Sequence, residues 1–126
     1  MAKVLSELSA LKETDPNGIG QHEPGAKLDH GKNRVDLVLS GFAHALEQVC
    51  WVGTYGAQKY TDDGWTHVPN GVSRYADAAG RHALKMRKGE VLDPDCEKDG
   101  WEIYHEAQVI WNLLAAFELR LRNEKA

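Results

Sequence analysis

The sequence predicts an all-α fold. In three long segments, apolar residues recur at steps of three and four, which is the period of a helix with one buried face. Turn-forming groups of Gly, Pro, Asn and Asp separate these segments. No run of alternating apolar and polar residues is long enough to predict a strand. We therefore expect a helical core at residues 35–122, preceded by an irregular arm at residues 1–31.

Length and composition indicate a single domain. With 126 residues, of which 42% are hydrophobic, the chain can build one modest core but not two. The net charge of −4 argues against a general nucleic-acid binder. The first residues lack the long apolar run of a signal peptide or a membrane span. We therefore expect a cytoplasmic protein that binds neither nucleic acid nor membranes.

The N-terminal part begins with a weak helical pattern at Lys3–Lys12, followed by a segment rich in Gly and Pro at Thr14–Gly31. The first long helix is expected at Val35–Lys59, with Asp36 near its start. Its predicted apolar face consists of Val38, Leu39, Phe42, Leu46, Val49 and Cys50. Cys50 is therefore expected to be a packed thiol rather than half of a disulfide.

The middle of the chain predicts a second helix at Val72–Lys88, between a loop at Thr61–Gly71 and a polar loop at Glu90–Gly100. Gly89 stands where a helix commonly ends. Small side chains on this helix would let a neighbouring helix pack closely, and these are Ala76, Ala79, Gly80 and Ala83.

The last helix is expected from Trp101 onward, with a buried face formed by Ile103, Ala107, Ile110, Leu114, Phe117 and Leu121. On another face, Glu102, His105 and Glu106 lie within about one turn. Such a cluster is costly to desolvate unless it is paired, and a divalent cation is a suitable partner. Carboxylates suit Mg²⁺ or Mn²⁺, whereas His105 would shift the preference towards another transition metal. The alternative is a solvated first turn, because the helix dipole favours acidic residues at a helix N-terminus.

Glu47, on the first helix, is the natural third ligand, with a surface glutamate as the alternative. Arg74 and Arg81 can make forked contacts with phosphates, or simply form a solvated basic face. His82 faces inward, where a satisfied core histidine is commoner than a ligand. Trp65 would stack on a base or cover the core. The remaining candidates for a polyphosphate ligand are Lys32, Arg34, Lys59 and Tyr60.

The chain contains four blocks in a fixed order between Gly25 and Arg122, namely GAKLDHGKNRVDL, LEQVCWVGTYGAQKYTDDGW, RYADAAGRH and GEVLDPD…HEAQVIWNLL. As a set they resemble the phage and bacterial dATP/dGTP diphosphohydrolases, which are short relatives of the MazG-like nucleoside triphosphate pyrophosphohydrolases. The resemblance implies an antiparallel helical bundle of MazG-like type. The chain departs from the MazG acidic pattern, because Cys50 follows Glu47 by three residues and Glu102 and Glu106 are four apart.

The resemblance also implies a reaction, in which a purine deoxynucleoside triphosphate, dGTP and also dATP, is hydrolysed to its monophosphate and pyrophosphate. In phage members of the family the dGMP feeds synthesis of the 2-aminoadenine nucleotide, which would place this protein in the host cytoplasm. One or more Mg²⁺ or Mn²⁺ ions would be bound by Glu47, Glu102 and Glu106, with Glu47 and Glu106 as catalytic residues. His82 and His105 would orient these ligands or complete the coordination.

The same resemblance assigns charge neutralisation of the phosphates to Arg74, Arg81 and Lys32, and base stacking to Trp65 and Tyr60. Related enzymes form dimers or tetramers, so a homo-oligomer is expected. Two other interpretations stay open. One is a metal-dependent phosphohydrolase that releases phosphate or triphosphate from nucleotides, supported by the histidines. The other is a non-enzymatic helical adaptor with an acidic, solvated last helix.

Overall fold

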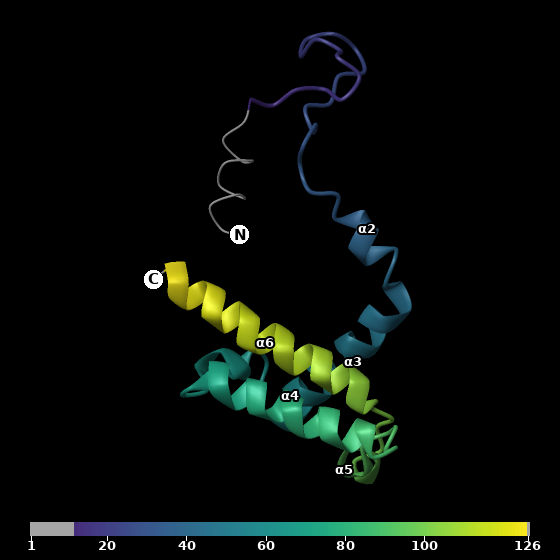
Figure 1. The fold of residues 1–126 in the computed structure, drawn as a ribbon, viewed down its shortest axis with the longest axis vertical. Coiled ribbons are helices and arrows are strands. Elements are labelled where there is room, and N and C mark those ends of the chain that lie inside the picture. Colours follow the sequence, from purple (N-terminus) through teal and green to yellow (C-terminus); the bar gives the residue numbers. More distant parts are fainter. Residues whose placement is uncertain (1–11, 126) are drawn as a thin grey trace. The chain divides into compact units, whose positions relative to one another are not determined.

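The protein is described by a computed structural model that covers residues 12–125. The described part is helical (Figure 1). Its strand pairing is limited to one isolated bridge between Leu92 and Tyr104. The predicted all-α fold is confirmed. None of the described helices is both long and apolar enough to cross a membrane. The helix expected at 3–12 lies outside the described residues, except for Lys12, which is not helical.

The chain divides into two compact units, Met1–Gly41 and Phe42–Ala126. In the first unit, Asp15 organises the Gly- and Pro-rich segment, because its buried carboxylate accepts backbone N–H groups of Lys27 (2.9 Å), Asn17 (2.7 Å) and Ile19 (3.4 Å). These hydrogen bonds, that of Lys27 above all, lower the pKa of Asp15 against the opposing effect of burial. The segment is irregular, as predicted. Whether the chain acts as one domain stays a prediction.

The first long helix is not continuous, contrary to the prediction for Val35–Lys59. A short helix α2 spans Asp36–Leu39, and helix α3 spans Ala43–Lys59. Gly41 lies in the break, where its backbone passes so close to the Leu37 carbonyl that a side chain would clash. Glycine also has a low helix propensity. The predicted apolar face is therefore interrupted, and Leu39 and Phe42 are exposed.

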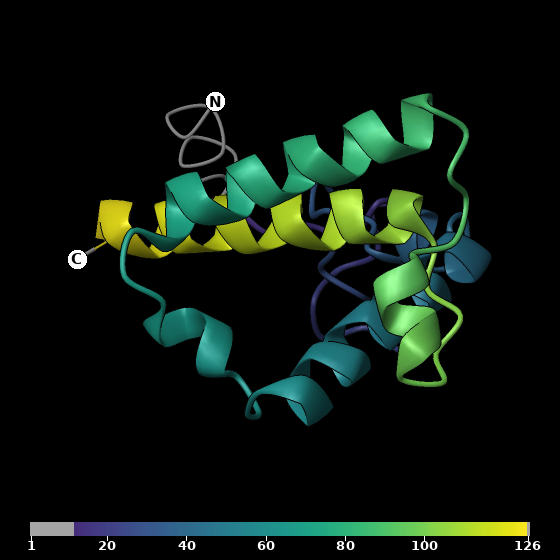
Figure 2. The ribbon, with the colours of Figure 1, turned by 90° about the horizontal axis from the view of Figure 1, so that it is seen from below.

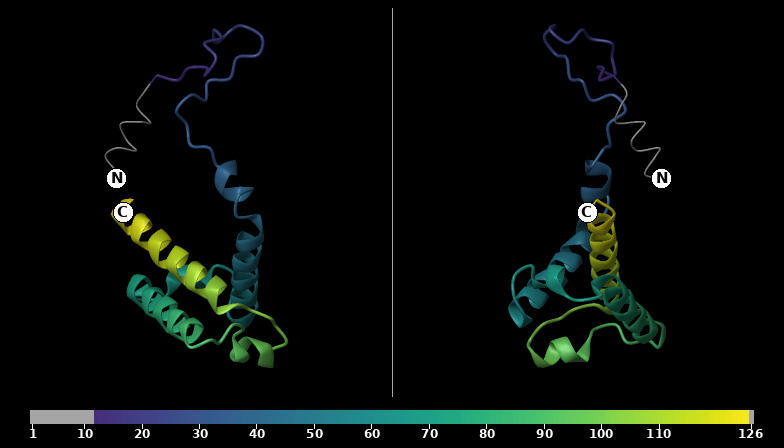
Figure 3. Two further views of the ribbon diagram at one scale, coloured as in Figure 1. Left: turned by 45° about the vertical axis from the view of Figure 1, so that its right-hand side comes forward. Right: turned by 90° about the vertical axis from the view of Figure 1, so that its left-hand side faces the viewer.

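The second unit is built around helix α4 (Gly71–Arg87) and helix α6 (His105–Lys125), which lie side by side (Figures 2 and 3). Their directions are opposite, because Gly71 approaches Leu119 at one end and His82 contacts His105 at the other. A Cβ atom on Gly71 would lie 2.6 Å from Cδ1 of Leu119, so glycine permits this close approach. The predicted bounds of α4, Val72–Lys88, are correct within one residue.

The apolar core of the second unit joins α3 to the start of α6. Its buried members are Val52, Cys96, Ile103 and Ala107, and Tyr55, Trp101 and Trp111 pack against them. Two short helices were not predicted: the 3-10 helix η1 (Gly64–His67) and helix α5 (Pro94–Lys98). Helix α5 begins where Asp93 accepts a hydrogen bond from the Asp95 N–H, at 2.9 Å, with Pro94 in the first helical position.

Helix α6 differs from its prediction in both its start and its buried side. It begins at His105 and not at Trp101, because the preceding residues pair with the loop after α4: Asp93 N–H donates to the Ile103 carbonyl at 2.8 Å. Its buried side carries polar and small residues, namely His105, Ala107, Gln108, Asn112, Ala115 and Ala116. The residues wrongly expected inside are exposed, namely Ile110, Leu114, Phe117 and Leu121. Whether the chain forms a homo-oligomer stays a prediction.

The prediction of a packed thiol at Cys50 is wrong. Cys50 is exposed and Cys96 is buried in the core. Burial, together with the nearby charge of Asp93, raises the pKa of the Cys96 thiol to about 11. Because the thiolate is the reactive species, Cys96 is protected both by access and by its protonation.

We therefore expect a thiol reagent at about pH 8 to modify one cysteine of the folded protein rapidly, and the second only after denaturation. Absorbance of the released thiolate from an aromatic disulfide reagent measures this. In Cys50→Ser the rapid phase should disappear, whereas Cys96→Ser should keep it. Two equally fast thiols in the native protein would contradict the assigned burial.

Candidate functional site

The second unit contains a large cavity, with a volume of about 1130 Å³. Its lining comes from α3, η1, the following turn, α4 and α6. Small-molecule sites in proteins commonly measure several hundred to about 1,000 Å³, so this space suits a ligand of nucleotide size. A separate, smaller cavity of about 260 Å³ lies in the first unit, beside α2.

The large cavity brings together residues that were predicted from separate parts of the sequence. These are Lys59, Tyr60, Trp65, Arg74, Arg81 and His82. Lys32 and Arg34 instead line the smaller cavity of the first unit, where Lys32 forms an ion pair with Glu13 at 2.9 Å. Whether any of these residues binds substrate stays a prediction.

Helix α4 supplies a charged wall of the cavity. Arg74, Asp77 and Arg81 follow at steps of three and four and thus lie on one side of the helix. The guanidinium of Arg74 donates to the Pro69 carbonyl at 3.1 Å, which anchors that side chain to the preceding turn. Lys59, at the end of α3, adds a third cation and lies 5.3 Å from the centre of the Tyr60 ring.

Aromatic side chains form another part of the lining. Trp111 of α6 is met edge-on by Trp65 of η1 and by Tyr75 of α4, with ring centres 6.0 and 5.6 Å apart. Arg122 places its guanidinium 5.5 Å from the centre of the Trp65 ring. Gly53 faces the indole Nε1 of Trp111, where a Cβ atom would come within 3.3 Å. The cavity therefore combines cations with flat apolar surfaces.

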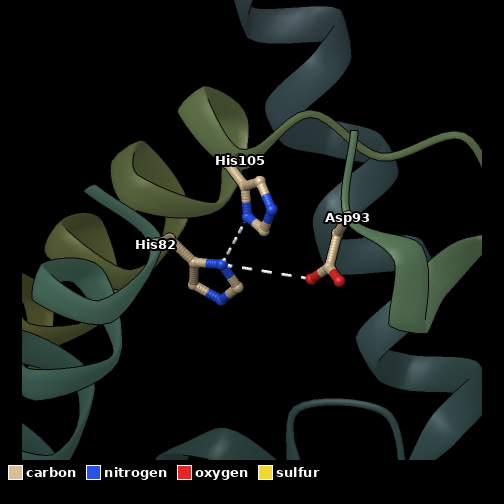
Figure 4. A group of neighbouring side chains, drawn as sticks. All are labelled: His82, Asp93 and His105. Atoms are coloured by element: carbon tan, nitrogen blue, oxygen red, sulfur yellow. Dashed lines mark hydrogen bonds and ion pairs between the residues drawn. The ribbon is translucent and has the colours of Figure 1, made fainter. Parts of the chain in front are cut away.

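His82, Asp93 and His105 form a polar cluster (Figure 4), and one of them, His82, lines the cavity. His82 projects from α4, His105 from the first position of α6, and Asp93 from the loop between them. The two Nδ1 atoms are 2.9 Å apart, and Nδ1 of His82 lies 4.0 Å from Oδ2 of Asp93. His105 is fully buried, whereas His82 is half-buried and lines the cavity.

Two neighbours hold this cluster in position. Glu90 Oε2 lies 2.7 Å from Nε2 of His105, and Gln108 donates from Nε2 to Asp93 Oδ2 at 2.8 Å. An ionised carboxylate only accepts, so Nε2 of His105 carries the hydrogen of this bond. In a neutral His105 ring, Nδ1 is then an acceptor, and the proton between the two Nδ1 atoms belongs to His82.

The charges of the cluster follow from burial and hydrogen bonding. Burial lowers the pKa of His82, with the carboxylate of Asp93 acting in the opposite direction, so the ring is neutral at pH 7. For Asp93, burial would raise the pKa. The hydrogen bonds from Gln108 and the Asp95 N–H outweigh that effect and lower it, so the carboxylate is ionised.

The residues predicted to bind a metal are not gathered in this way. Glu102 precedes α6 instead of sharing a helical face with His105 and Glu106, which corrects the predicted arrangement. Glu47, Glu102 and Glu106 are all exposed. Among the described residues, the group that offers three donor atoms within 4.8 Å of one another is His82, Asp93 and His105. A metal-binding or catalytic role for the three glutamates stays a prediction.

Sequence reasoning overlooked Asp93 and Glu90 as site residues. Both lie in a segment that was interpreted as a polar loop. The Asp-Pro pair at positions 93 and 94 is a recognisable helix-start signal, so the sequence could have predicted that Asp93 lies at the beginning of a helix. Its approach to His82 depends on tertiary packing and has no local signal.

One comparison with known proteins gives a match. A family profile described as "dATP/dGTP diphosphohydrolase, N-terminal" matches residues 22–126. The match covers the cavity and the polar cluster completely. No curated protein and no solved structure gives a significant match.

The lowered pKa of His82 predicts a dependence of stability on pH. Between the ordinary pKa of 6.5 and the folded value below it, the unfolded chain binds a proton that folded His82 does not. The contribution of this group is therefore complete above about pH 6.5 and is lost as the pH falls through the folded pKa. We expect the free energy of unfolding, measured with urea in the presence of EDTA, to fall between about pH 8 and pH 5. The fall should be smaller for His82→Gln than for the unsubstituted protein. Parallel losses would contradict the assignment.

Proposed function

Because this chain belongs to the family of dATP/dGTP diphosphohydrolase N-terminal domains, we propose that it hydrolyses purine deoxynucleoside triphosphates to the monophosphate and pyrophosphate. The membership supports the hydrolase class. The observation that supports a nucleoside triphosphate as the substrate is the large cavity, which is lined by Arg74, Arg81 and Lys59 together with aromatic rings. A nucleoside triphosphate joins an aromatic base to a polyanion, so the lining complements both of its ends.

In this proposal the cations bind the polyphosphate. Guanidinium groups make two parallel hydrogen bonds to phosphate oxygens, and Arg74 is already oriented by its bond to the Pro69 carbonyl. As the bond to the leaving pyrophosphate breaks, negative charge grows on the β-phosphate. Positive groups fixed in a partly enclosed cavity stabilise that charge more than mobile water does. Arg81, next to His82 on α4, is the cation nearest in sequence to the polar cluster.

The base is assigned to the aromatic part of the cavity. Trp65 and Tyr60 are exposed enough to be reached, and the ring of Trp65 is held by Trp111 on one edge and by Arg122. Stacking of a base on such a ring is worth about 1–3 kcal/mol and favours the larger purine surface. The preference between guanine and adenine needs hydrogen-bonding groups in addition.

The reaction is the attack of a water oxygen on the α-phosphorus. The new bond joins that oxygen to phosphorus, the bond to the α–β bridging oxygen breaks, and pyrophosphate leaves with its electron pair. The water gives one proton to the solvent or to a nearby base. A divalent ion, Mg²⁺ or Mn²⁺, would lower the pKa of the attacking water and offset phosphate charge. The two imidazoles and the ionised carboxylate of Asp93 are donors that fit Mn²⁺.

A second candidate, release of intact triphosphate or of single phosphate, is also compatible with the site. The polar cluster contains two histidines and an aspartate, and this donor set could hold a metal ion for either reaction. The phosphorus atom that is attacked, and therefore the product, separates the two reactions.

We expect purified protein incubated with dGTP or dATP and Mn²⁺ to release the monophosphate and pyrophosphate, and EDTA to stop the release. Anion-exchange chromatography of the nucleotides with a pyrophosphate assay measures both products, and dCTP and dTTP serve as base controls. Deoxynucleoside with triphosphate, or the diphosphate with single phosphate, would favour the second candidate. No turnover with any divalent ion would favour a binding protein.

Replacing Arg81 with Ala should lower kcat/KM for dGTP about 10- to 100-fold, because a hydrogen bond to a charged group contributes about 1.5–3 kcal/mol. Arg87→Ala is the matched control, since Arg87 lies on the same helix, is exposed, and does not line the cavity. Steady-state rates over a range of dGTP concentrations give the ratio. Equal losses in the two variants would point to general electrostatic attraction and not to a phosphate contact.

A further inference from the structure

We propose that His82, Asp93 and His105 form a centre for one transition-metal ion, bound through Nδ1 of each histidine and Oδ2 of Asp93. The centre deepens the proposed function, on which its catalytic use rests, by assigning the ion to the wall of the nucleotide cavity. Binding of the ion can be measured without nucleotide, so the centre and the reaction are tested separately.

The three donor atoms of the proposed centre lie within 4.8 Å of one another. Histidine and carboxylate ligands lie about 2.0–2.2 Å from such an ion, so neighbouring donor atoms are about 3 Å apart. The two Nδ1 atoms already have this spacing, at 2.9 Å. Oδ2 of Asp93 is 4.0 Å from Nδ1 of His82, so binding of the ion requires the carboxylate to move about 1–2 Å towards the two histidines.

Two of the three donors, His105 and Asp93, are each held by a partner outside the set. Glu90 accepts the Nε2 hydrogen of His105, which leaves the Nδ1 lone pair directed at His82. A carboxylate behind the imidazole is the usual companion of a metal-bound histidine, because it fixes the ring and raises its basicity. Gln108 holds Asp93 in the same manner, because its side-chain Nε2 donates to Oδ2 of Asp93 at 2.8 Å.

The arrangement without an ion depends on a single proton between two nitrogen atoms. His82 donates that proton from Nδ1, so its Nε2 is unprotonated and turned away from His105. When the ion takes the place of the proton, the proton moves to Nε2 of His82 and the ring remains neutral. The exchange requires no charged imidazole, in keeping with the burial of His105.

The donor types select the ion. Two imidazoles and one carboxylate suit Mn²⁺, Fe²⁺, Co²⁺ or Zn²⁺, whereas Mg²⁺ prefers oxygen atoms alone. Three protein ligands leave positions open for water or a phosphate oxygen. His82 lines the cavity, so the open positions meet the space assigned to the triphosphate. The alternative is that the cluster is purely structural, held by hydrogen bonds and without affinity for metal.

The test is a titration of the metal-free full chain with Co²⁺, whose visible absorption reports nitrogen and oxygen ligation. We expect one Co²⁺ per chain, and binding at least tenfold tighter than that of Mg²⁺ measured by competition. His82→Ala and Asp93→Asn should weaken Co²⁺ binding at least 100-fold. Glu90→Gln, which removes only the charge behind His105, should weaken it about 10- to 100-fold.

His44→Ala is the matched control, because His44 is an exposed histidine on α3 outside the cluster. It should bind Co²⁺ as the unsubstituted chain does. Circular dichroism confirms folding, and if His82→Ala unfolds, Asp93→Asn and Glu90→Gln decide, since asparagine keeps the helix cap. Equal Co²⁺ affinity in all variants, or none in the unsubstituted chain, would overturn the centre.

The two proposals fail in different ways. A chain that hydrolyses dGTP with Mg²⁺ but binds no Co²⁺ would overturn the centre and leave the proposed function standing. A chain that binds Co²⁺ through these residues but hydrolyses no nucleotide would overturn the function and keep the centre.

Discussion

The antiparallel packing of α4 against α6 is the constraint on which the rest of the second unit depends. The side of α6 that meets α4 carries His105, Gln108 and Asn112, so these polar groups leave water when the helices pair. Their burial is costly unless each hydrogen-bonding atom finds a partner. The loop between the helices supplies Glu90 as the partner of His105 and Asp93 as the partner of Gln108, and Asn112 donates to the backbone carbonyl of Gln108. Packing and site geometry are therefore one problem in this fold.

Much of the helical architecture could be predicted, because it is encoded locally. Helix α4 begins and ends within a residue of its expected bounds, since its turn residues and its helical period agree. Arg74, Arg81 and His82 all lie on this helix and line one cavity, although the period assigns the arginines and His82 to different faces. Lys59, Tyr60 and Trp65 join them, because α3 ends and η1 begins beside that wall. Their assignment to a ligand rests on chemistry and stays a prediction.

Other features depend on contacts that a single sequence does not record. Hydrophobic periodicity assumes that the apolar side of a helix is buried, and α6 reverses this, with Leu114 and Phe117 exposed while Asn112 is buried. The pairing of Asp93 with the Ile103 carbonyl delays the start of α6 and separates Glu102 from it. No local signal indicates that His105 and His82 approach across the helix pair, so the predicted cluster of glutamates and the observed cluster share one residue.

Asp93 makes several structural contacts at once, so position 93 is expected to tolerate few substitutions. One carboxylate oxygen caps α5, the other accepts from Gln108 and faces His82, and the backbone N–H holds the strand-like segment before α6. His82, in contrast, sits within a continuous helix and is half-buried. In a library of variants scored for both abundance and activity, most substitutions at position 93 would lower the two scores together. Substitutions at position 82 would separate them, which marks the position where selection for chemistry acts without selection for folding.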